Sequence, residues 1–89
     1  MSNNIFFDKD GNLTDDAKVH GYKWVCIAPG YMGGHPAIFG KRVSVQFILE
    51  RIEEGHTPEE IQQDFNLPLE AVQEAIRFAK ENLSSRRAS

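Results

Sequence analysis

The feature that most constrains this chain is the run of helix start and stop signals over residues 44–83. In "GHTPEEIQQDFNLPLEAVQEAIRFA", Gly55 ends one helix and Thr57 can cap the next. Pro58 then takes the first helical position, where its missing N–H costs least, and Glu60 stands three residues after the cap, as in a capping box. This punctuation predicts three short helices separated by two tight turns, in the spacing of a helix-turn-helix.

Each predicted helix carries apolar residues at helical spacing. We expect the first helix to run from a Ser44 cap through Glu54, the second from Thr57 to about Phe65, and the third from about Pro68 to Leu83. Burying one large apolar side chain contributes roughly 1.5–3 kcal/mol, so packing the three apolar stripes together would drive folding. The stripe residues are Val45, Ile48, Leu49 and Ile52, then Ile61 and Phe65, then Leu69, Val72, Ile76, Ala79 and Leu83.

The first half of the chain has a different character. A short hairpin is expected around the Asp10-Gly11 turn, a strand over residues 22–28, and an irregular glycine- and proline-rich loop over residues 29–42 without a regular element. The predicted fold is therefore mainly α, a homeodomain-like or winged-helix-like three-helix core with short N-terminal strands. We divide it into an N-terminal extension (1–26), a helix-turn-helix domain (27–83) and a flexible tail (84–89).

Composition narrows the class of protein. The 89 residues form one domain with a net charge of −3, and binding to DNA is favoured by positive charge. Cys26 is the only cysteine, which excludes an internal disulfide and fits a reducing cytoplasm. No apolar run reaches the roughly 20 residues of a membrane span, and the first residues do not resemble a secretory signal. We expect a bacterial cytoplasmic protein without a membrane partner.

The chain contains two partial matches to ligand-binding motifs, and neither is complete. "DKDGN" begins like a calcium loop, but the required glycine and glutamate positions hold Leu13 and Val19. "GHPAIFGK" has five residues between its glycines instead of the four of a phosphate-binding loop, and arginine follows the lysine. The three histidines do not stand at metal-ligand spacing. We therefore expect no enzyme activity, cofactor, metal or small-molecule ligand.

Residues 27–79 resemble the domain-of-unknown-function family 433, an antitoxin-like helix-turn-helix family of prokaryotes. The resemblance lies in "PGYMGGHPAIFGKRVSV", "ILERIEEGHTPEEI" and "DFNLPLEAVQEAIRFA", which follow the family's order and spacing. Lys41 and Asn66 depart from the family pattern, which commonly has threonine and proline there. The resemblance implies a three-helix core that is often a homodimer. It also implies a partner, a PIN-like ribonuclease toxin, and binding to operator DNA.

Two functions remain open at this point. In the first, a transcriptional regulator reads DNA with Gln73 and Arg77 of the third helix, although Glu70 and Glu74 would face the groove. In the second, the acidic third helix belongs to a module that binds only protein, with its polar residues solvated and paired as Glu74–Arg77 and Arg77–Glu81.

Further candidate contacts lie outside the stripes. Lys41 and Arg42 can reach phosphate, although Arg42 can instead donate to backbone carbonyls of the glycine loop. Arg86 and Arg87 form a basic tail that can clasp a phosphate backbone. Phe47 and Phe78 lie off their helical stripes, so either they form a partner surface or the N-terminal strands cover them.

Overall fold

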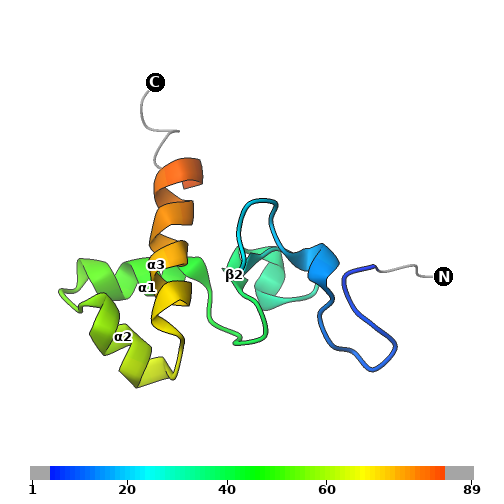
Figure 1. Ribbon diagram of the computed structural model, residues 1–89, viewed down its shortest axis with the longest axis horizontal. Helices are drawn as coiled ribbons and strands as arrows, with labels where there is room; N and C mark the ends of the chain where they lie inside the picture. The colour runs from blue at the N-terminus through cyan, green and yellow to red at the C-terminus, as the bar shows by residue number, and fades with distance from the viewer. Residues whose placement is uncertain (1–4, 84–89) are drawn as a thin grey trace.

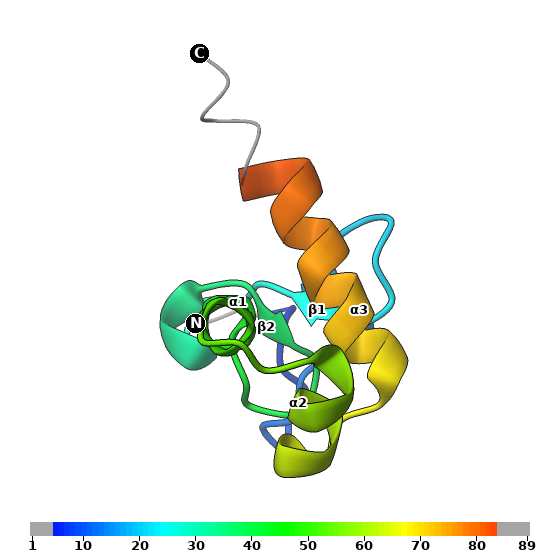
Figure 2. The same cartoon turned by 90° about the vertical axis from the view of Figure 1, so that its left-hand side faces the viewer.

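A computed structural model describes residues 5–83 of the chain, with three α-helices and a small antiparallel sheet. The helices are α1 (Val45–Glu53), α2 (Pro58–Phe65) and α3 (Leu69–Phe78), and α3 continues into a π-helical turn, η3 (Ala79–Leu83). The strands are β1 (Val25–Cys26) and β2 (Ala37–Ile38). One 3-10 turn, η1 (Asp15–Ala17), precedes β1, and a second, η2 (Met32–Gly34), lies between the strands. The helices gather at one end of the molecule, where α3 crosses α1 (Figures 1 and 2). No helix within residues 5–83 has the length and apolarity needed to cross a membrane.

The helices begin and end close to the predicted residues. Ser44 caps α1, because its hydroxyl accepts the backbone N–H of Phe47 at 3.0 Å. At α2, the Thr57 hydroxyl accepts the N–H of Glu60 at 3.1 Å, and the Glu60 carboxylate accepts the N–H of Thr57 at 2.9 Å. Asn66 ends α2 at a φ of 53°, a left-handed conformation that asparagine tolerates well. The prediction of three helices with a capping box is confirmed.

The strands are shorter than predicted, and one is in an unexpected place. The strand expected over residues 22–28 contracts to the two residues of β1. Its partner β2 lies inside the segment 29–42, so the prediction of no regular element there is wrong. The expected hairpin is reduced to a single antiparallel bridge between Phe7 and Leu13. A two-residue strand is defined by its partner more than by its own composition, which is why local sequence did not reveal β2.

The sheet separates two clusters of buried residues. Val25 pairs with Ile38, and Cys26 pairs with Ala37. Neighbouring residues of a strand point to opposite faces, so the first pair joins the helical core and the second joins a smaller N-terminal cluster. The helical core also contains Val45, Ile48, Ile61, Leu67, Ala71, Val72, Ala75 and Phe78, and the smaller cluster contains Ala17, Ala28 and Tyr31.

The buried line along α3 differs from the predicted stripe. Ala71 and Ala75 are fully buried although neither was in the predicted stripe, whereas Ile76 is only half-buried. The reason is that α3 packs against β1 as well as against α1 and α2. Alanine side chains on this line are small enough to let β1 approach the helix closely. This contact brings the N-terminal segment alongside α3, where the candidate site lies.

Candidate functional site

The outward polar face of α3 holds the segment Gly21–Val25 of the same chain. The Glu74 carboxylate accepts the backbone N–H groups of Lys23 at 2.8 Å and Val25 at 3.0 Å, and also that of Trp24 between them. Only 12% of the Glu74 side chain is exposed. Hydrogen bonds to an ionised acceptor are roughly twice as strong as neutral ones. Glu74 is therefore an anchor for the N-terminal segment instead of a solvated side chain.

Glu70 strengthens the same attachment one turn earlier. Its carboxylate accepts the indole N–H of Trp24 at 3.0 Å and lies 3.4 Å from the ammonium group of Lys23. The bond from Trp24 and the charge of Lys23 hold the pKa of Glu70 below its usual 4.5. The two carboxylates that the sequence marks as awkward for DNA contact thus have partners within the protein. That awkwardness was the available signal, but the sequence did not show which segment they bind.

Arg77 is engaged by the same segment. Its guanidinium carbon lies 4.3 Å from the centre of the Tyr22 ring, and it donates to the Gly21 carbonyl at 3.2 Å. It also lies 3.1 Å from the Glu81 carboxylate and 3.7 Å from that of Glu74. The predicted Glu74–Arg77 and Arg77–Glu81 pairs are confirmed. Arg77 would have to give up these contacts to bind a guanine edge.

Tyr22 closes this contact at the end of α3. Its hydroxyl donates to the Glu81 carboxylate, which raises the pKa of Tyr22 above 10.0 and lowers the pKa of Glu81 below 4.5. The Tyr22 ring meets that of Phe78 edge-to-face, with centroids 5.2 Å apart. Phe78 is only 4% exposed, so the prediction that it forms an exposed partner surface is wrong. The alternative prediction, that N-terminal residues cover Phe78, is confirmed, because Tyr22 packs on it.

The other residues predicted to bind nucleic acid lie on different elements. Gln73 is exposed on α3, and Lys41 is exposed in the turn between β2 and α1. Arg42 follows Lys41, but its guanidinium does not donate to carbonyls of the glycine loop. It lies over the Tyr31 ring, 5.7 Å from its centre, and the Tyr31 hydroxyl accepts the backbone N–H of Arg42 at 2.9 Å. Arg86 and Arg87 lie outside the described residues.

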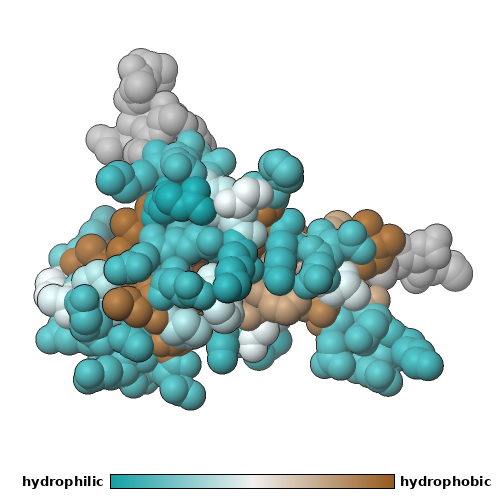
Figure 3. All heavy atoms as spheres, in the orientation of Figure 1, coloured by the Kyte–Doolittle hydropathy of each residue, from teal (hydrophilic) through white to brown (hydrophobic). Residues whose placement is uncertain are grey.

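Phe47 remains at the surface on the α1 side of the molecule. It is half-buried and packs edge-to-face on Phe65, with ring centroids 5.1 Å apart. Two adjoining hollows of about 380 and 340 Å³ share Met32, Ser44 and Phe47 in their walls. We call this pair of hollows the Phe47 groove. Figure 3 shows apolar patches at the helical end of the molecule within a mainly hydrophilic surface.

The negative charge of the chain is concentrated in a segment that begins at Glu50, a residue of the groove wall. Residues 50–64, which span the end of α1 and most of α2, carry six carboxylates and one arginine, a net charge of −5. The rest of the chain has nine cations and seven carboxylates, a net charge of +2. All six carboxylates of the acidic segment belong to exposed residues. This part of the surface favours a positively charged partner.

Comparison with known protein families gives a match over the helices and strands. A family model described as "Protein of unknown function (DUF433)" matches residues 25–79, from β1 to the first residue of η3. No curated protein and no solved structure matches the chain. The match confirms the resemblance and covers more than half of the 89 residues, including the three helices, both strands and Glu74. The chain therefore belongs to the DUF433 family of proteins of unknown function.

Proposed function

We propose that this protein is an antitoxin-like helix-turn-helix protein that acts by binding a basic protein partner and does not use α3 to read DNA. The observation that carries the proposal is the attachment of Gly21–Val25 to the outward face of α3. The partner that the family resemblance implies is a PIN-like ribonuclease toxin. A homodimer in a bacterial cytoplasm remains part of the same proposal.

The attachment makes α3 a poor reading helix. In a DNA-binding helix-turn-helix, residues near the start of the recognition helix contact base edges in the major groove. Here Glu70 and Glu74 occupy that position and bind the protein's own N–H groups. Moving Glu74 away would leave the partly buried amides of Trp24 and Val25 unpaired, at about 1–3 kcal/mol each. Two carboxylates would also face the negatively charged phosphates.

The opposite side of the helical core offers a surface for protein. The Phe47 groove presents phenylalanine and methionine, which are enriched at protein interfaces. The acidic segment 50–64 begins with Glu50, whose side chain also lines the groove. Arg42 and Arg51 also lie at the groove, but the segment 50–64 has a net charge of −5, so an apolar anchor on a partner with a basic surface suits this side of the molecule.

DNA binding is tested by fluorescence anisotropy of a labelled duplex from upstream of the gene, with a scrambled duplex as control. We expect equal binding of the two at near-physiological salt. Gln73→Ala is the informative variant, because Gln73 is exposed and its loss leaves the Gly21–Val25 attachment in place. A preference for the native duplex that Gln73→Ala abolishes would show that α3 reads DNA and would overturn this part of the proposal.

Partner binding is tested by capture from a lysate with variants of the groove and of the acidic segment. Phe47→Ala should reduce affinity about 30-fold or more if Phe47 is a central anchor. The double variant Glu53→Lys with Asp64→Lys should also reduce the affinity for the partner. It should not destabilise the fold, because each lysine stands near a helix C-terminus, where positive charge is favourable. Gln73→Ala is the matched control and should bind normally. Capture of the same protein by all variants would contradict the proposed surface.

A further inference from the structure

The Phe47 groove has one positive and one negative end. Arg42 lies in the wall of the hollow that reaches Phe65, and Glu50 lies in the wall of the other hollow. Phe47 and Met32 belong to both hollows, so the middle of the groove has an apolar lining. The groove therefore presents an apolar centre between two opposite charges.

Neither of these charges is neutralised within the described residues 5–83. Arg51 and Arg77 form ion pairs with glutamates, whereas no carboxylate of this range lies within ion-pair distance of Arg42. The Glu50 carboxylate accepts a hydrogen bond from the side-chain amide of Gln46 at 3.4 Å, and it too forms no ion pair within the same range. Both charged residues are exposed, so a partner can reach them.

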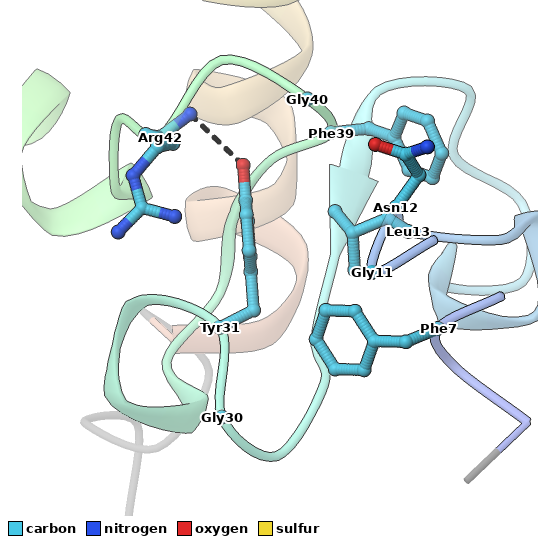
Figure 4. Close-up of a pocket in the computed structure, with 9 residues that line it drawn as sticks. All are labelled: Phe7, Gly11, Asn12, Leu13, Gly30, Tyr31, Phe39, Gly40 and Arg42. Carbon is cyan, nitrogen blue, oxygen red and sulfur yellow. Dashed lines mark hydrogen bonds between the residues drawn. The ribbon is translucent and has the colours of Figure 1, made fainter. Parts of the chain in front are cut away.

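The fold holds Arg42 at its end of the groove. Figure 4 shows the N-terminal pocket beside Tyr31, with Arg42 on the face of the tyrosine ring opposite to Phe7. The guanidinium carbon lies 5.7 Å from the ring centre, and the hydroxyl of the buried Tyr31 accepts the backbone N–H of Arg42 at 2.9 Å. A guanidinium placed on an aromatic face keeps its N–H groups for a carboxylate, which it can bind through two parallel hydrogen bonds.

Backbone conformation sets the same wall of the groove apart. Within residues 5–83, the residues other than glycine that have a positive φ are Met32 (49°), Arg42 (55°) and Asn66 (53°). Asn66 ends α2, and asparagine tolerates this conformation well. Met32 and Arg42 lack that tolerance, yet both line the hollow that reaches Phe65. Strained residues are concentrated at binding sites and switches, so this strain supports a binding role for the groove.

We propose that the segment of the basic partner that enters the Phe47 groove carries an acidic side chain beside its apolar anchor. The acidic side chain binds Arg42, the apolar anchor packs on Phe47, and a basic side chain binds Glu50. This inference rests on the proposed function, and it adds that the docking segment carries both signs of charge although the partner as a whole is basic. A second copy of this chain fits less well, because the interface would then contain two acidic segments 50–64, each with a net charge of −5.

The test is an NMR titration of the full-length ¹⁵N-labelled protein with three end-blocked hexapeptides. All three have the centre Ala-Leu-Leu-Ala, and their end residues are lysine and glutamate, two lysines, or two glutamates. Near-physiological salt screens charges that are more than about 8 Å apart, so the comparison reports on contacts within the groove. We expect the lysine–glutamate peptide to bind about threefold or more tightly than either of the others, with shifts centred on the amides of Met32, Arg42 and Phe47. If the two-lysine peptide binds equally well, or if no peptide binds at millimolar concentration, the proposal is overturned.

Arg42→Gly is the decisive variant, because glycine adopts a positive φ without strain and the fold should be retained. It should abolish the preference for the lysine–glutamate peptide over the two-lysine peptide. Lys41→Ala is the matched control, since Lys41 carries the same charge, is exposed and lies outside the walls of the groove. An unchanged preference in Arg42→Gly, or an equal loss of preference in Lys41→Ala, would refute the role of Arg42.

These measurements separate the failure of this inference from the failure of the proposed function. Capture of a basic partner that Phe47→Ala weakens, together with equal binding of the lysine–glutamate and two-lysine peptides, would refute only the acidic side chain. A preference for the lysine–glutamate peptide without any captured partner would support the charge requirement of the groove and count against the proposed function. Sedimentation of the protein alone tests the other occupant, because a dimer that Phe47→Ala dissociates would place a second copy in the groove and overturn the proposal.

Discussion

Replacing Glu74 by alanine should destabilise the whole domain. The change removes the acceptor of three backbone N–H groups, of which those of Trp24 and Val25 are partly buried and that of Lys23 is exposed. Water can replace the lost acceptor only at Lys23. Two unpaired amides at about 1–3 kcal/mol each predict a loss of about 2–6 kcal/mol. A domain of 89 residues has about 4–13 kcal/mol of total stability, so the loss is a large fraction of it.

Glu74→Gln should reduce stability less than Glu74→Ala, because the two carboxylate oxygens have different partners. Oε1 of Glu74 accepts from Trp24 and Val25, and Oε2 accepts from Lys23. A glutamine with its oxygen at the Oε1 position retains both partly buried bonds, now with a neutral acceptor. Its NH₂ group then faces the N–H of Lys23, and the ion pair with Arg77 is lost. We expect a loss of about 1–2 kcal/mol.

Urea unfolding measures both effects, with Trp24 as the only tryptophan and helical circular dichroism as the second signal. The two transitions should coincide in the wild type, because Val25 is part of the helical core. Glu53→Ala is the matched control, since Glu53 is exposed at the end of α1 and should change stability by less than about 0.5 kcal/mol. If Glu74→Ala is no more destabilising than Glu53→Ala, the anchoring role of Glu74 is refuted.

Three further predictions concern pH, capping and the thiol. The pKa values of Glu70 and Glu81 are lowered in the folded protein, so both groups add stability above pH 4.5. This stability is lost as the pH falls through their folded pKa values. The double variant Glu70→Gln with Glu81→Gln should therefore show a smaller fall of the urea midpoint at acid pH than the wild type. Thr57→Ala should cost about 1 kcal/mol in the same assay, and an unchanged midpoint would mean that the capping box does not contribute. Burial raises the pKa of Cys26 to about 11, so a thiol reagent at pH 8 should modify only unfolded protein. Rapid modification of the native protein would contradict the burial of Cys26.

The sequence predicts the helical half of this protein well, because its signals are local. Caps such as Ser44 and Thr57, and the turn at Asn66, act within four residues of their own position. The apolar stripes of α1 and α2 likewise follow from helical spacing alone. The positions of the three helices are therefore encoded by nearby residues, although α3 ends at Phe78 and the π-helical turn η3 takes the place of its predicted last turn.

The candidate sites could be predicted only in part, since they depend on residues far apart in the chain. Glu70, Glu74 and Arg77 were correctly placed on the outward face of the third helix. Their partners lie about fifty residues earlier, and no local pattern connects the two segments. Tertiary structure alone decided that this face binds Gly21–Val25 and that Phe78 is buried under Tyr22. It also brought the N-terminal turn beside Tyr31 and Arg42 to form a pocket. Helices depend on neighbours along the chain, whereas a surface depends on which segments meet in space.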